Sequence, residues 1–191
     1  MTHEERKRKT KQGFAEALKE LLKTKPLNKI TVTDLVKACN VNRKTFYYYF
    51  EDIYALIEWM LEEEAINVVK EFDLLVDFEE AALFVIDYIE QNDYMLKCAY
   101  DTLGQYELKR FLYNDFYELV IYAIHQIEAE NGYEVDEDYE QMVCNFFMEA
   151  VAGVIIGRIM NPKRLEKKQA AQNLDTILYS SVKAALQAKS Q

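Results

Sequence analysis

Residues 30–57 read ITVTDLVKACNVNRKTFYYYFEDIYALI, and this stretch decides the fold of the N-terminal part of the chain. Its pattern predicts a short helix, a tight turn, a second short helix and the start of a third. Thr31 is a suitable N-cap, and Asp34 follows at the spacing of a capping box. Asn40 tolerates the left-handed conformation that the turn requires, and Asn42 caps the second helix. This order of elements is typical of a helix-turn-helix unit, whose second helix enters the DNA major groove.

The second helix, residues 42–49, combines cations with tyrosines. Arg43 or Lys44 can donate to guanine or neutralise phosphate, and tyrosine hydroxyls suit phosphate oxygens. A purely core role for the tyrosines is the alternative, but three consecutive residues point about 100° apart on a helix and cannot all face inward. Phe46 and Phe50 are expected to pack inward. The predicted DNA-binding residues are Thr31, Thr33, Asn42, Arg43, Lys44, Thr45, Tyr47, Tyr48 and Tyr49.

Charge is divided unevenly along the chain. The formal net charge of −10 by itself argues against nucleic-acid binding. Residues 1–50, however, hold 12 Lys and Arg against 5 Asp and Glu, and the remaining residues hold 11 against 28. A basic end on an acidic chain is expected when only that end meets phosphate. A basic helix face that is merely solvated is the alternative, which the motif in residues 30–57 weakens.

The rest of the sequence predicts an all-α protein. Five glycines and two prolines in 191 residues are too few for the turns of a strand-rich fold. Apolar residues recur at helical spacing throughout. The predicted helices cover residues 6–23, 31–38, 42–49, 52–72, 78–92, 93–103, 106–131, 136–161 and 165–188, with breaks at Pro26, Gly104, Gly132 and Pro162.

Cysteine, histidine and hydropathy patterns argue against several other classes of protein. Cys39, Cys98 and Cys144 are odd in number and far apart, and none belongs to a CxxC pair. With only His3 and His125 as imidazole ligands, we predict no metal site, no cofactor and no disulfide framework. No apolar run approaches the ~18–20 residues of a membrane span, and the charged amino terminus lacks a signal-peptide core. We expect a cytoplasmic protein without a membrane partner.

These motifs resemble the DNA-binding part of the TetR/AcrR-type family of transcriptional regulators. The matches are I-T-V-x-D-L at 30–35, V-N-x-x-T-F-Y-Y at 41–48 and F-x-D-x-x-x-L at 50–56, within a similarity over residues 8–57. The resemblance implies about nine helices in two domains. Residues 1–51, the head, would be a three-helix helix-turn-helix domain, and residues 52–191, the body, a helical effector-binding and dimerisation domain. The resemblance also implies that Tyr47 binds a phosphate group of the DNA backbone.

Three positions depart from the family's pattern. Tyr49 stands where the family often has histidine, and Asn40 stands where it often has glycine. Ile53 stands where it often has a phosphate-binding lysine, so one cation is missing from the DNA edge. The basic run between Arg6 and Lys11 is expected to compensate by contacting the neighbouring DNA backbone.

A palindromic operator needs two heads, so the expected partners are double-stranded DNA and a second copy of the chain. Small residues spaced by three and four in the 136–161 helix let another helix approach closely, and the last helix supplies an apolar stripe. The alternative is that these faces pack within one chain. The predicted dimer contacts are Ala150, Gly153, Gly157, Leu174, Ile177, Leu178 and Ser181.

A ligand pocket in the body would combine aromatic walls with polar groups. Taken singly, each candidate is more often a core residue than a ligand contact, and some family members bind a protein partner in the body instead. A tyrosine-rich segment, 106–122, is faintly similar to that of members regulating dihydroxyacetone-kinase operons, and we base no prediction on it. The candidates are Trp59, Tyr100, Tyr113, Tyr117, His125 and Phe147, with Phe146, Glu149 and Met160 beside them.

The resulting hypothesis is a homodimeric regulator, by family default a repressor, that binds a palindromic operator through residues 42–49. A ligand or protein partner in the body would control its DNA affinity. One alternative is an activator, or a helical interaction protein, whose body binds a protein partner without a small-molecule effector. A small helical enzyme is another, but the sequence offers no nucleophile elbow, phosphate loop, HExxH motif or paired metal ligands.

Overall fold

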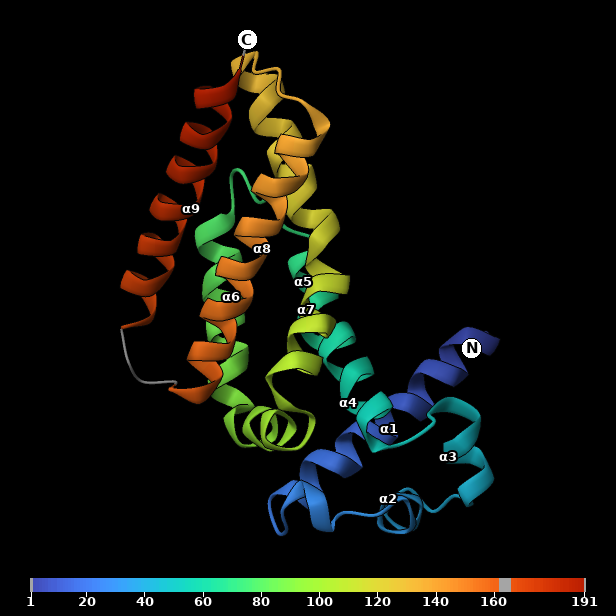
Figure 1. Cartoon of the computed structure of the whole chain (residues 1–191). Coiled ribbons are helices and arrows are strands. Elements are labelled where there is room, and N and C mark those ends of the chain that lie inside the picture. The colour runs from blue at the N-terminus through green and yellow to red at the C-terminus, as the bar shows by residue number, and fades with distance from the viewer. Residues whose placement is uncertain (1, 162–165, 191) are drawn as a thin grey trace.

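The computed structural model describes residues 2–161 and 166–190, and within them every regular element is a helix. The all-α prediction is therefore confirmed. Figure 1 shows a small lobe of N-terminal helices beside a larger body of helices. The head contains α1 (His3–Leu22), a 3₁₀ turn η1 (Leu27–Lys29), α2 (Val32–Ala38) and α3 (Arg43–Tyr49).

A single helical run leads from the head into the body. It consists of α4 (Ile53–Leu61), a π-helical turn η2 (Glu62–Ile66) and α5 (Asn67–Val69). The body then contains α6 (Phe78–Gln91), α7 (Asp93–Asn131), α8 (Glu137–Met160) and α9 (Lys167–Lys189). The most extensive packing joins α7 to α8 and α6 to α9 (Figure 1). One continuous apolar core extends from α1 through α4 into α7, α8 and α9.

The head is held together by aromatic side chains that the sequence pattern placed inward. Phe14 of α1 and Phe46 of α3 are both fully buried, and their rings meet edge to face with centroids 5.2 Å apart. Phe50 packs onto Phe14 in the same manner at 6.3 Å. Such pairs add about 0.5–1.5 kcal/mol beyond the burial of their area. They fix α3 against α1 and leave the opposite face of α3 outside.

Side-chain caps set the ends of α2 and α3, as the sequence predicts. Thr31 Oγ1 accepts a hydrogen bond from the Asp34 amide at 3.2 Å, and Asp34 Oδ2 accepts from the Thr31 amide at 2.8 Å. Lys25 and these Thr31 contacts hold the pKa of the Asp34 carboxyl well below its usual range. Asn40 makes the turn with φ 52°, and Asn42 Oδ1 accepts from the Thr45 amide at 2.9 Å.

Several helix boundaries follow the predicted breaks and others differ. Gly104 has φ 81° and ψ 168°, a non-helical conformation that kinks α7, and Gly132, with φ 66°, ends this helix. The first helix starts three residues earlier than expected because Thr2 caps it through a capping box with Glu5. The helix expected to reach residue 72 ends at Val69, after the π turn. The predicted break at residue 162 and helix start at 165 lie outside the described residues.

Helix α8 is, by length and composition alone, apolar enough to cross a membrane. We expected no such segment because no uninterrupted apolar run approaches a spanning length. The average over an 18-residue stretch of α8 tolerates two charged residues, so by this criterion the expectation was wrong. Of the apolar stretch, 39% is buried inside the chain, and the core helix of a globular protein meets the same criterion.

Replacing Phe46 by alanine should strongly destabilise the head. The change removes a fully buried ring and its contacts with Phe14 and Phe50, which costs about 3–5 kcal/mol in comparable cores. Urea unfolding followed by circular dichroism measures the loss. The matched control is Tyr48→Ala, two residues along the same helix, whose 68% exposed side chain should change stability by less than about 0.5 kcal/mol. Equal losses for the two variants would contradict this account of the head core.

Candidate nucleic-acid interface

Helix α3 has one buried face and one exposed face. Phe46 is fully buried, whereas Tyr47 and Tyr48 are 50% and 68% exposed. Arg43 and Lys44 at the amino end are also exposed. The alternative that all three consecutive tyrosines belong to the core is therefore wrong. The exposed face presents two cations and two phenol groups, which are donors suited to phosphate and base edges.

Tyr49 differs from the expected outward orientation. It is half-buried against the head core, and its ring meets that of Tyr48 edge to face at 4.8 Å. Because Tyr49 follows Phe46 by three positions on a helix, it shares much of the buried face. Thr45 is also only partly exposed. The outward set is accordingly narrower than predicted.

Arg43 and Tyr47 form a pair along the exposed face of α3. Arg43 Nη2 donates to the Tyr47 hydroxyl at 3.2 Å, and the guanidinium lies 5.8 Å from the ring centroid. This i,i+4 contact holds the guanidinium alongside the helix and leaves its remaining N–H groups free of that bond. The pair can therefore present a cation and a hydroxyl to adjacent DNA groups.

The remaining predicted contacts lie at helix amino ends. The Thr31 hydroxyl donates to Asp34 Oδ2 at 2.7 Å, so its first role is to cap α2. Thr33 is partly exposed in the first turn of α2. Asn42 is exposed and caps α3 through its amide oxygen, which leaves the amide NH₂ as a donor. Amino ends of helices favour phosphate because their N–H groups lack intrahelical partners.

The basic run on α1 is shared between exposed and internally paired cations. Arg6 and Lys9 are exposed. Lys7 pairs with Glu4 at 2.9 Å, and Arg8 Nη2 pairs with Glu63 Oε2 of the π turn at 2.8 Å. Lys11 lies 5.3 Å from the centroid of the Trp59 ring. Partners on α4 and the π turn were not foreseeable from the run itself, because they lie about fifty residues away in sequence.

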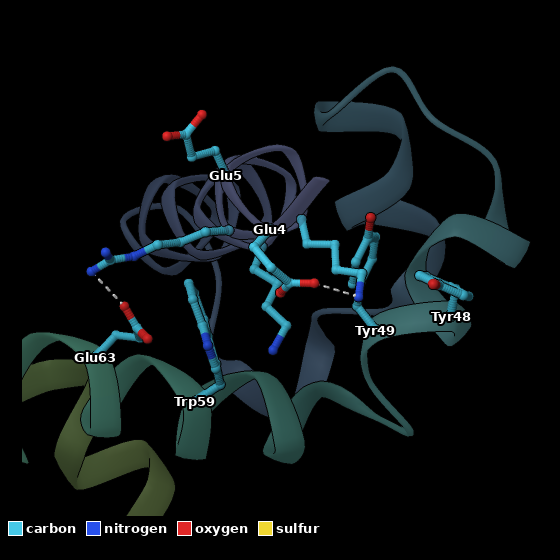
Figure 2. Close-up of a pocket in the computed structure, with 9 residues that line it drawn as sticks. Glu4, Glu5, Tyr48, Tyr49, Trp59 and Glu63 are labelled. Carbon is cyan, nitrogen blue, oxygen red and sulfur yellow. Dashed lines mark hydrogen bonds and ion pairs between the residues drawn. The ribbon is translucent and has the colours of Figure 1, made fainter. Parts of the chain in front are cut away.

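Lys7, Arg8 and Lys11 line an open hollow of about 710 Å³ between α1, α3 and the α4 run, whereas Arg6 and Lys9 do not. Figure 2 shows Trp59 and Glu63 facing α1 across it, with Tyr48 and Tyr49 on the α3 side. Trp59, predicted as a ligand residue of the body, thus belongs to the wall of a surface hollow beside the head. Ile53, at the start of α4, packs partly buried against the core, which explains an apolar residue there.

The other predicted ligand residues lie mainly along the seam between α7 and α8. Tyr113 Oη donates to Glu149 Oε1 at 2.8 Å, and the Tyr117 hydroxyl accepts from Gln141. Burial and the Glu149 carboxylate raise the pKa of Tyr113 to about 12. Phe147 of α8 is buried there, and the partly buried Tyr100 packs on the core. His125 Nε2 lies 3.0 Å from Glu140 Oε1. Phe146 and Met160 are exposed.

None of Tyr100, Tyr113, Tyr117, His125 and Phe147 lines the hollow beside the head. They also do not line a second hollow of about 600 Å³, which lies between residues 19–26 and residues 91–95. Most of the predicted ligand residues therefore lie on the neighbouring helices α7 and α8, away from Trp59.

The predicted dimer residues of α8 are exposed in the single chain. Ala150, Gly153 and Gly157 all face outward, and a Cβ added at either glycine would meet no atom within 4 Å. Packing within one chain is therefore not the reason for small residues at these positions. On α9, Ile177 and Ser181 are exposed, whereas Leu174 and Leu178 are half-buried and partly fit the intramolecular alternative. Exposed apolar neighbours extend the α8 face: Met142, Phe146, Val154 and Met160.

Comparison with known proteins matches both parts of the chain. The family model for bacterial regulatory proteins of the tetR family matches residues 15–60, and the model for a transcriptional regulator C-terminal region matches residues 77–180. The curated HTH-type dhaKLM operon transcriptional activator DhaS of Lactococcus lactis subsp. lactis (strain IL1403) is 20% identical over 158 residues, covering 83% of each chain.

Two solved structures share the fold. The dihydroxyacetone kinase operon activator DhaS has a TM-score of 0.69 at 16% identity, covering 95% of this chain and 98% of its own. A TetR transcriptional regulator from Streptococcus agalactiae 2603V has a TM-score of 0.51 at 21% identity, covering 92% and 96%.

Exposed cations of α3 should contribute to the salt dependence of DNA binding. Replacing Lys44 by alanine removes one phosphate-neutralising charge. The negative slope of the logarithm of the binding constant against the logarithm of the salt concentration should therefore become less steep by about 1. Fluorescence anisotropy with a labelled duplex over a salt series measures the slope. Lys168→Ala, an exposed lysine at the start of α9, is the matched control and should leave the slope unchanged. A slope that responds equally to both changes would place the interface elsewhere.

Proposed function

Because the chain belongs to the TetR family of transcriptional regulators, we propose that it binds a palindromic DNA operator as a homodimer and controls transcription there. We assign residues 1–51 to the DNA-binding head and residues 52–191 to the body. The observation that carries the proposal is the exposed face of α3. Arg43, Lys44, Tyr47 and Tyr48 are exposed to solvent there, while the buried Phe46 anchors the helix. This face lies on the basic end of an acidic chain.

The exposed face of α8 supports the homodimer. Gly153 and Gly157 leave open space on the single chain, so a helix of a second copy can approach the α8 backbone closely. The apolar side chains of Phe146 and Val154 beside them would be removed from water in such a contact. With Ile177 of α9, these residues fit a four-helix interface, which would hold two heads at a fixed spacing for two half-sites.

A polar relay between the head and α6 supports control of DNA affinity by the body. Lys19 Nζ of α1 lies 2.6 Å from Glu64 Oε2 in the π turn, and the Tyr88 hydroxyl of α6 donates to the same oxygen at 3.2 Å. Burial and the Glu64 charge raise the pKa of Tyr88, so this hydroxyl keeps its proton. Arg8 and Glu63 add a second link between α1 and the π turn. A ligand or protein partner that moves α6 would thereby reorient the head.

The direction of regulation has two candidates. Repression is the family default, but the DhaS proteins that resemble this chain over most of its length are activators by name. This similarity favours activation as the second candidate. Placing the selected operator beside a promoter and a reporter gene distinguishes them, since an activator raises expression in the presence of the protein and a repressor lowers it.

Selection from a random pool of DNA duplexes tests operator binding. The full-length protein should enrich a palindrome at moderate salt, with half-sites about one or two helical turns apart. Arg43→Ala combined with Lys44→Ala should abolish enrichment while the dimer remains intact on size-exclusion chromatography. A pool without any enriched palindrome would refute the proposal.

The variant Gly157→Arg tests the homodimer, by the same DNA selection and by size-exclusion chromatography. The new side chain has open space on the single chain, so folding should be retained, but it would block the close approach of a second α8. Enrichment of a full palindrome should be lost together with the dimer. Asn114→Arg, at an exposed position of α7, is the matched control.

The relay is testable without knowing the effector, because coupling between two binding sites is reciprocal. If the body controls the head, binding of operator DNA must in turn change the body. Hydrogen exchange of α6 amides near Tyr88 should slow on operator binding, and Glu64→Gln should reduce this response by weakening both contacts. Glu80→Gln, an exposed glutamate on α6, should leave the response intact. An unchanged response in Glu64→Gln would exclude this relay.

A further inference from the structure

Three potential metal ligands meet at the end of the body remote from the chain's basic run. His125 and Glu128 lie one turn apart on α7, and Glu140 faces them from the first turn of α8. His125 Nε2 lies 3.0 Å from Glu140 Oε1. One ligand atom from each of the three side chains lies within 4.8 Å of the others.

The cluster brings the carboxylates of Glu128 and Glu140 together, but one oxygen of Glu128 is left without a hydrogen-bond donor in the part of the chain that the structure describes. Glu128 Oε1 is shielded from solvent and has no hydrogen-bond partner among the described residues. A shielded carboxylate oxygen without a donor is costly. The His125–Glu140 pair alone therefore does not account for Glu128.

We propose that His125, Glu128 and Glu140 form a binding site for a divalent transition-metal ion, with Zn²⁺ as the best fit. An imidazole nitrogen with carboxylate oxygens is a ligand set that Zn²⁺ accepts, whereas Mg²⁺ and Ca²⁺ prefer oxygen ligands alone. Donor atoms around tetrahedral Zn²⁺ lie about 3–4 Å apart, so small side-chain rotations close the observed cluster around an ion. Water would complete the coordination.

The neighbouring thiol is not part of this site. Cys144 lies one turn beyond Glu140 on α8 and is fully buried. Its sulfur is not among the ligand atoms that lie within 4.8 Å of one another in the cluster. The proposed site thus has nitrogen and oxygen ligands without sulfur. It joins α7 to α8 across the connection at Gly132, and a bound ion would stabilise this helical hairpin.

We had expected no metal site, because only His3 and His125 are available as imidazole ligands and no cysteine belongs to a CxxC pair. The fold brings them together by reversing the chain between α7 and α8. The site lies in the body and does not rest on DNA binding.

Isothermal titration of the full-length, metal-free protein with ZnCl₂ tests the site. The native protein should bind one Zn²⁺ per chain, and added Zn²⁺ should raise its midpoint temperature of thermal unfolding. His125→Gln and Glu128→Gln should each weaken binding by at least about tenfold, since even outer-shell changes at metal sites cost 10–100-fold. His125 is 54% exposed, so its replacement should leave the fold intact, as circular dichroism would verify.

The matched control is His3→Gln, which removes the other histidine of the chain and should leave Zn²⁺ affinity unchanged. Co²⁺ is a second probe, and its complex should lack an intense sulfur-to-metal charge-transfer band because no thiolate is a ligand. Absence of Zn²⁺ binding by the native protein would overturn the proposal. Equal affinity of native protein and His125→Gln, or a sulfur-to-cobalt band, would also overturn it.

Discussion

The edge-to-face contact between Phe14 and Phe46 is the constraint on which the exposed face of α3 depends. A seven-residue helix such as α3 is too short to be stable alone in water. It persists because one fully buried ring ties it to α1, while the Asn42 cap satisfies its amino end. That single anchor also sets the rotation of the helix, and the rotation decides that Tyr47 and Tyr48 face outward and Tyr49 does not.

A second constraint is the acidic π turn at residues 62–66, which interrupts the helical run between head and body. Glu63 forms an ion pair with Arg8 of α1, and Glu64 forms one with Lys19. Glu64 also accepts a hydrogen bond from Tyr88. Single π turns are uncommon and occur frequently at functional sites. Here the turn concentrates the polar contacts between two parts of the chain that otherwise share an apolar core.

Much of the head was predictable because its determinants are local. The capping box of Thr31, the left-handed Asn40 and the inward Phe46 all follow from residue types within a few positions. The burial of Tyr49 was missed, although its spacing from Phe46 carried the signal. The partners of Arg8 and Lys19 were not predictable, since ion pairs between α1 and the π turn depend on how two helices cross. The His125, Glu128 and Glu140 cluster was missed for the same reason. The small residues of α8 are evident from their spacing and are exposed, and their role in a dimer stays a prediction.

The uneven charge of the chain has a kinetic consequence. With 12 cations against 5 anions in residues 1–50 and an acidic remainder, the molecule carries a large permanent dipole. In the field of a polyanion such a molecule is turned during its approach, so that collisions occur basic end first. The fraction of productive encounters rises, and the rotational search that normally slows docking is shortened. The acidic body also penalises sideways adsorption, which favours rapid escape from a duplex lacking the right sequence.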